Sequence, residues 1–130
     1  MAEQTVRRIL VVEDDPTMTE MLSILLEETG CEIVTASTGE QALDLAREQA
    51  LDLVTLDLGL PGMDGRELLR RFRLDPQTTN VPVIVVTAMR FDRSADERIA
   101  AVLQKPFDCV ELEEAVRGVL DYAQRPSRLA

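Results

Sequence analysis

Five polar residues lie at or just after the ends of short apolar segments, and their types suit the binding of a cation and an anion together. Glu13 and Asp14 follow the first such segment, and Asp57 ends a later one. Thr87 contributes a hydroxyl group and Lys105 an ammonium group from two further segments. Three carboxylates that meet in one place repel one another, so at least one would have a raised pKa unless a cation joined them. Mg²⁺ suits a site of few carboxylates plus waters, and we predict a magnesium site here.

The same five residues predict a phosphoryl-transfer site centred on one carboxylate. A positioned Asp is a nucleophile in enzymes that form an aspartyl-phosphate. Lys105 would hold an anionic group near Asp57, and Thr87 would donate a hydrogen bond to it. The metal and the lysine would neutralise the charge, and positioning would do most of the catalytic work.

The surrounding elements must bring these residues together, and the apolar pattern predicts how. The segment Leu51–Asp57 is almost continuously apolar, which is typical of a strand buried on both faces of a parallel sheet. Strand and helix patterns alternate along the whole chain, with strands expected over 7–12, 31–36, 51–57, 81–87 and 101–104. This alternation predicts an α/β fold, a flavodoxin-like open parallel sheet of five strands with helices on both faces. With strand order 2-1-3-4-5, the first and third strands are neighbours, and their acidic residues meet at the carboxyl edge of the sheet, where such folds bind ligands.

Other acidic residues are better explained as helix caps than as site residues. Each precedes an apolar helical pattern, and some are followed three residues later by Glu, which is typical of a capping box. Asp15 precedes Pro16, which is favoured at the first helical position. The remaining predicted cap pairs are Ser37 with Glu40, Asp64 with Glu67, and Asp108 with Glu111.

The composition is that of one globular domain. The chain has 130 residues, of which 45% are hydrophobic and 29% charged, and its formal net charge is −10. This charge argues against contact with nucleic-acid phosphates or an anionic membrane, so neither is expected as a partner. No apolar run is long enough to cross a bilayer and no secretory leader is apparent, so we expect a cytoplasmic protein. We interpret Cys31 and Cys109 as free thiols of a reducing compartment.

Four motifs in the chain, taken in order, resemble those of response-regulator receiver domains of two-component signalling. They are Ile9-Leu10-Val11-Val12-Glu13-Asp14-Asp15, Asp57-Leu58-Gly59-Leu60-Pro61-Gly62-Met63-Asp64-Gly65, Val85-Val86-Thr87-Ala88 and Lys105-Pro106-Phe107. The resemblance implies that Glu13, Asp14 and Asp57 bind Mg²⁺, with the backbone carbonyl of Gly59 as a further ligand. It also implies that Asp57 is phosphorylated, that Thr87 and Lys105 contact the phosphoryl oxygens, and that the Lys105–Pro106 bond is cis.

The chain departs from this family between Thr87 and Lys105, where it is shorter than usual. The shortening falls where the fourth helix of the family lies, so we predict that this helix is short or missing, with at most one or two turns over 95–100. Val102 occupies the position of the family's switching aromatic residue. We therefore expect an intact phosphorylation site with an altered readout.

These observations lead to a main hypothesis and two alternatives. The main one is a stand-alone receiver over residues 6–123, with tails over 1–5 and 124–130. It would accept a phosphoryl group from a histidine kinase or phosphotransfer protein and signal to a downstream protein target, without being an enzyme for other substrates. The first alternative is a pseudo-receiver that binds proteins independently of phosphate. The second, an aspartyl-phosphate phosphatase, ranks last because Gly59 stands where such enzymes place a second acid.

Overall fold

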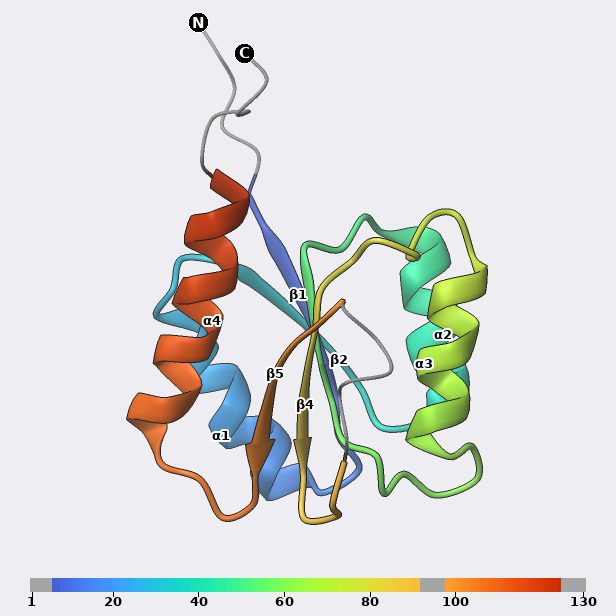
Figure 1. Ribbon diagram of the computed structural model, residues 1–130, viewed down its shortest axis with the longest axis horizontal. Coiled ribbons are helices and arrows are strands. Elements are labelled where there is room, and N and C mark those ends of the chain that lie inside the picture. The colour runs from blue at the N-terminus through green and yellow to red at the C-terminus, as the bar shows by residue number, and fades with distance from the viewer. Residues whose placement is uncertain (1–5, 92–97, 125–130) are drawn as a thin grey trace, which may run out of the picture.

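The computed structural model describes residues 6–91 and 98–124, which form a single layered α/β unit (Figure 1). Within these described residues, five strands and four helices follow one another, alternating through most of their length. In chain order they are β1 (Arg8–Val12), α1 (Pro16–Glu27), β2 (Glu32–Ala36), α2 (Gly39–Glu48), β3 (Leu53–Leu56), α3 (Gly65–Leu74), β4 (Val83–Thr87), β5 (Ile99–Gln104) and α4 (Cys109–Gln124). Over the described residues, no helix has the length and apolar character that a membrane crossing needs.

The sheet is fully parallel and its strand order is β2-β1-β3-β4-β5, which confirms the predicted topology. The register aligns the carboxyl ends of the strands, since Val12 pairs with Leu56 and Leu56 with Val85. The arrowheads of β4 and β5 point to the lower edge of the molecule in Figure 1. The segments that follow the strands therefore gather at that edge.

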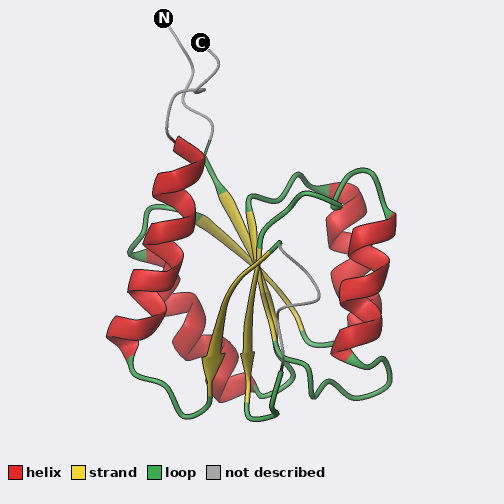
Figure 2. Ribbon diagram, viewed as in Figure 1, coloured by secondary structure: helices red, strands yellow, loops and turns green. Residues whose placement is uncertain are grey.

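Two apolar cores lie on opposite faces of the sheet, and each is covered by a pair of helices (Figure 2). Alternate residues of each strand point to opposite faces, so Leu10 joins one core and Val11 the other. Helices α2 and α3 cover the first core, where Phe72 is buried. Helices α1 and α4 cover the second, where Leu112 is buried. This double cover explains why the central strands are almost continuously apolar.

Most of the predicted helix starts are confirmed. The carboxylates of Asp15 and Asp64 accept hydrogen bonds from backbone N–H groups two residues on. Asp108 forms a reciprocal capping box, because its carboxylate accepts from the N–H of Glu111 and its own N–H donates to the Glu111 side chain. Glu67 does not close such a box. It pairs with arginines of its own helix instead.

The predicted cap of α2 was wrong by one residue. Thr38, not Ser37, is the N-cap, and its hydroxyl accepts from the N–H of Gln41 at 3.1 Å. The Gln41 side chain closes the turn by accepting from the backbone N–H of Ser37 at 2.8 Å. Glu40 has no part in these cap bonds.

The described residues of the connection between β4 and β5 agree with the prediction that the family's fourth helix is short or missing. None of its described residues, 88–91 and Arg98, is helical. Residues 92–97 lie outside the described part of the chain, and with them half of the turn predicted over 95–100. The other half of that prediction was wrong, because β5 begins at Ile99 rather than Ala101, and Ile99 pairs with Val83. The helix labelled α4 is the C-terminal one.

Candidate functional site

The carboxyl ends of four strands converge on one polar site. Backbone hydrogen bonds between neighbouring strand ends fix the position of the residues that follow them. The Asp57 N–H donates to the Val12 carbonyl at 3.1 Å, and the Glu13 N–H donates to the Ala36 carbonyl at 3.0 Å. On the other side, the N–H of Lys105 donates to the carbonyl of Thr87 at 2.8 Å. The sheet thus brings together residues from distant parts of the sequence.

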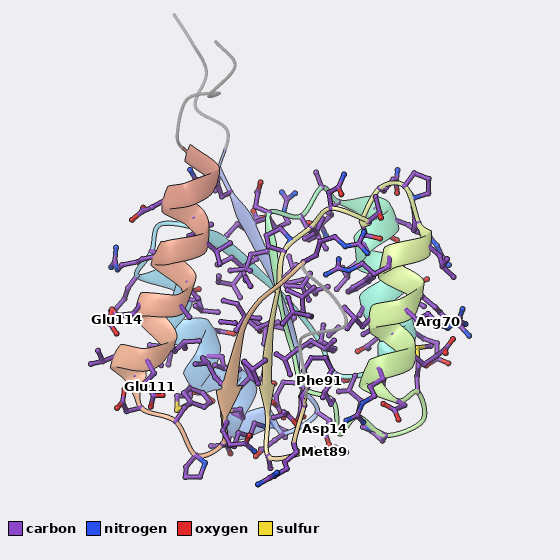
Figure 3. All side chains as sticks on the ribbon, viewed as in Figure 1. Asp14, Arg70, Met89, Phe91, Glu111 and Glu114 are labelled. Carbon is purple, nitrogen blue, oxygen red and sulfur yellow. The ribbon has the colours of Figure 1, made fainter. Side chains whose placement is uncertain are left out.

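Glu13, Asp14 and Asp57 form an acidic cluster in which one carboxylate oxygen from each residue lies within 4.8 Å of the others. Glu13 is only 2% exposed and Asp57 only 8%, whereas Asp14 is exposed to solvent. Figure 3 places Asp14 at the lower edge of the sheet, where it faces outward. Two buried carboxylates and an exposed one provide oxygen ligands that remain accessible from solvent. This donor set fits Mg²⁺.

The ammonium group of Lys105 bridges the two buried carboxylates. Its Nζ atom lies 3.0 Å from Glu13 Oε1 and 3.0 Å from Asp57 Oδ2. Burial lowers the pKa of Lys105, but the hydrogen bonds to Glu13 and Asp57 and the charges of these carboxylates together outweigh it, so the net shift of the pKa is upward. The lysine is therefore held in its charged form next to Asp57.

The predicted rise of a carboxyl pKa is confirmed at Glu13, although the expected cause was secondary. Burial is the largest effect and raises the pKa of Glu13 above its usual range. The Lys105 ammonium and the Asp15 N–H lower it, and the charge of Asp57 raises it only weakly. The pKa of Glu13 is therefore raised mainly by desolvation of its carboxylate and less by repulsion within the cluster.

The loop after Asp57 is held tightly against the start of α3. Asp57 Oδ1 accepts a hydrogen bond from the Gly59 N–H at 2.9 Å, so both carboxylate oxygens of Asp57 have a partner. The Gly65 N–H donates to the Leu58 carbonyl at 3.1 Å. A Cβ atom on Gly65 would lie 2.5 Å from the Cα of Leu58, so only glycine permits this contact.

Thr87 is fully buried at the end of β4, and its hydroxyl oxygen accepts a hydrogen bond from the Met89 N–H at 3.1 Å. The Gln104 side-chain amide donates to the carbonyls of Ala88 and Met89 at 2.9 and 3.4 Å, which ties β5 to this turn. Gln104 directly precedes Lys105. The strand end that positions the lysine therefore also holds the turn after Thr87.

The structure brings the five predicted side chains to one edge and adds residues that the sequence patterns did not single out. Met89 is one, since its sulfur would lie 3.9 Å from a Cβ atom built on Gly59. Gln104 is another, and its position before Lys105 was the only sequence signal for it. The Lys105–Pro106 bond is cis, as expected.

The fold and the site together define a receiver domain, and comparison with known proteins agrees. The family model of the response regulator receiver domain matches residues 9–117. The chain therefore belongs to this family.

Curated relatives are full regulators of greater length. The DNA-binding dual master transcriptional regulator RpaA of Synechocystis sp. is 36% identical over 126 residues, covering 91% of this chain and 51% of the relative. The DNA-binding response regulator MtrA of Mycolicibacterium smegmatis is 39% identical over 122 residues, covering 88% and 50%. The chain thus spans about half the length of the curated relatives it matches. The expected absence of a nucleic-acid partner has no support from these relatives and stays a prediction for this chain's own residues.

Solved structures of receiver domains are similar over nearly their whole length. The receiver domain of a sensor histidine kinase from Pseudomonas aeruginosa, with a magnesium ion coordinated in its active-site cleft, is 28% identical with a TM-score of 0.79, covering 90% of this chain and 99% of that one. The response regulator TrrA of Thermotoga maritima, in complex with Mg²⁺ and BeF, is 34% identical with a TM-score of 0.76, covering 88% and 99%. Both hold magnesium, the ion that the acidic cluster here fits.

Proposed function

We propose that this chain is a phosphoacceptor receiver in which Asp57 takes a phosphoryl group from a phosphohistidine of a kinase or phosphotransfer protein. The observation that carries the proposal is the Lys105 ammonium, held 3.0 Å from both Asp57 and Glu13 at the edge of an accessible acidic cluster. A half-buried lysine that served only the fold would be satisfied by one carboxylate. Here it lies beside the carboxylate that a receiver phosphorylates.

In the proposed reaction an oxygen of Asp57 forms the bond to phosphorus while the phosphorus–nitrogen bond of the donor histidine breaks. The leaving imidazole keeps the electron pair of that bond. Lys105 then exchanges its contact with Asp57 Oδ2 for the phosphoryl oxygens, and the Gly59 N–H keeps the carboxylate oriented through Oδ1. Bound by Glu13, Asp14, Asp57 and the Gly59 carbonyl, Mg²⁺ would supply positive charge to the transferred group.

Thr87 is proposed as the residue that responds to phosphorylation. Its hydroxyl accepts from the Met89 N–H, and the same hydroxyl has its own proton to donate to a phosphoryl oxygen. A movement of Thr87 toward Asp57 would break or strain this contact. The turn after β4 would then change, and with it the surface presented to a downstream protein.

A pseudo-receiver that binds proteins without phosphate is the second candidate. The short connection between β4 and β5 favours it, since the described residues there form no helix that could relay a change. The complete acidic cluster and its lysine favour phosphorylation. The proposal covers the receiver unit; action without an output domain, and in the cytoplasm, stays a prediction.

Intact-mass measurement after incubation with Mg²⁺ and acetyl phosphate tests the proposal. We expect one phosphoryl adduct in the wild type that disappears in Asp57→Asn and when EDTA replaces Mg²⁺. Asp52→Asn is a matched control, because Asp52 is an exposed carboxylate before the same strand, away from the acidic cluster. An absent adduct, under conditions where a typical receiver labels, would favour the pseudo-receiver. An adduct that persists in Asp57→Asn would show that a residue other than Asp57 is phosphorylated.

A further inference from the structure

A shallow hollow of about 680 Å³ lies beside the proposed phosphorylation site, on the α3 side of the sheet. Its described lining consists of Arg66, Arg90, Phe91 and Gln104. Arg66 comes from the first turn of α3, Gln104 ends β5, and the other two belong to the connection after β4. Figure 3 shows Phe91 on this side of the sheet, above Met89, while Arg70 points outward from α3.

The described lining of the hollow carries two arginines and no acidic residue, in a chain whose net charge is −10. Arg66 and Arg90 are both exposed, and among the described residues neither forms an ion pair with an acidic side chain. The acid next to Arg66 in sequence is Glu67, which is already paired with Arg70 at 2.7 Å and Arg71 at 3.0 Å. Two guanidinium groups at this hollow therefore lack a carboxylate partner within the described part of the chain.

The described lining residues contact one another and the turn after β4. The Arg66 guanidinium donates to the Arg90 carbonyl at 3.2 Å and lies 5.8 Å from the centre of the Phe91 ring. Phe91 is half-buried and packs against the core between the sheet and α3. Gln104 is bonded to the turn that starts the same connection. A preorganised lining lowers the entropic cost of binding.

We propose that this hollow binds an acidic segment of a partner protein. A carboxylate would pair with the remaining N–H donors of Arg66 and with Arg90, and an apolar side chain would pack on Phe91. Nucleic acid is disfavoured because its phosphates would meet the field of a chain with ten excess negative charges. An acidic peptide segment meets the same field, but it carries far fewer charges than a duplex, and those few can lie against the two arginines.

The hollow is also coupled in space to the site at Asp57. Phe91 lies four residues after Thr87, and Gln104 directly precedes Lys105, so both walls continue the strand ends that carry the proposed phosphoryl contacts. The acidic segment proposed here would belong to the downstream partner, and only the link between its docking and phosphorylation rests on the proposed function. Docking itself needs no phosphate.

Binding of a fluorescein-labelled peptide of alternating Glu and Leu residues, followed by anisotropy at moderate salt, tests the inference. The loss of two exposed ion pairs should weaken binding about tenfold, or about 1.4 kcal/mol, in Arg66→Gln/Arg90→Gln. Arg47→Gln/Arg117→Gln is the matched control. It removes the same charge from exposed arginines of α2 and α4, and should bind within about twofold of the wild type.

A single substitution serves as a milder test in case the double variant does not fold. Arg90→Gln alone changes an exposed side chain without a described side-chain contact, and we expect it to weaken binding about threefold. No saturable binding, equal loss in the control variant, or tighter binding of a labelled DNA duplex would overturn the inference. Intact mass of Arg66→Gln/Arg90→Gln after acetyl phosphate treatment separates the two proposals, because this variant should still gain its adduct on Asp57. Peptide binding without any adduct in the wild type would contradict only the proposed function.

Discussion

The contact between Gly65 and the phosphoacceptor loop predicts that Gly65→Ala destabilises the protein, although alanine is the better helix former. A Cβ atom there would lie 2.5 Å from the Leu58 Cα and 2.8 Å from the Asp57 carbonyl oxygen. Both are backbone atoms, so no change of rotamer relieves the overlap. Overpacking of this kind costs about 1–3 kcal/mol, while the gain in helix propensity is at most about 1 kcal/mol and smaller in the first turn.

Gly118→Ala is the matched control, because it is the same substitution within helix α4. No atom lies within 4 Å of a Cβ built on Gly118, which is exposed. Here the helix propensity acts alone, and we expect a gain of about 0.5–1 kcal/mol. The two variants should therefore differ by roughly 2 kcal/mol with opposite signs relative to the wild type.

Urea unfolding followed by circular dichroism measures both effects. The midpoint should fall for Gly65→Ala and rise for Gly118→Ala, with similar slopes. Because the overlap falls on atoms of Asp57 and Leu58, folded Gly65→Ala should also label with acetyl phosphate about tenfold more slowly, since small displacements of reacting groups are costly. A Gly65→Ala protein as stable and as quickly labelled as the wild type would refute this account of the loop.

Three further predictions test the packing and the electrostatics. The buried hydroxyl of Thr55 has no hydrogen-bond partner among the described residues, so Thr55→Val should raise the free energy of unfolding by about 1 kcal/mol. A lower free energy of unfolding would mean that the hydroxyl does form a hydrogen bond in the folded protein. Leu112→Ala, at a fully buried site, should lower it by about 2–5 kcal/mol, whereas Val110→Ala at an exposed site should change it by less than about 0.5 kcal/mol. Hydrogen bonds from Arg70 and Arg71 lower the pKa of Glu67 from 4.5 to about 2, so its stabilising contribution is complete above pH 4.5 and lost as the pH falls toward 2. An NMR titration should find this low pKa and its return toward 4.5 in Arg70→Gln/Arg71→Gln.

Much of this architecture follows from local patterns that act independently of the fold. The apolar runs and the alternation of elements predict the five parallel strands, since the central runs are buried on both faces. The caps at Asp15 and Asp108 follow from side chains that bond to backbone groups two or three residues away. The choice of residues for the candidate site needed one more rule, that the carboxyl ends of parallel strands share an edge.

Local patterns failed where two registers were equally good. Ser37 and Thr38 are both hydroxyl residues, and Glu40 and Gln41 can both close a capping box, so the local pattern does not choose between the two pairs. The structure uses Thr38 and Gln41. Ile99 and Ala100 suit either a helical turn or a strand. Pairing of Ile99 with Val83, and its burial against the core, extended β5 to include them.

By itself, the sequence determined which groups stand at the strand ends and therefore the chemistry available at Asp57. Only the tertiary structure decided which of those charged groups pair with one another and how deeply each is buried. Lys105 lies between Glu13 and Asp57, and the pKa of Glu13 is governed mainly by burial. The basic hollow at Arg66 and Phe91 likewise joins residues from separate elements. Burial, charge pairing and shape depend on which distant segments meet, and no local pattern along the chain contains that information.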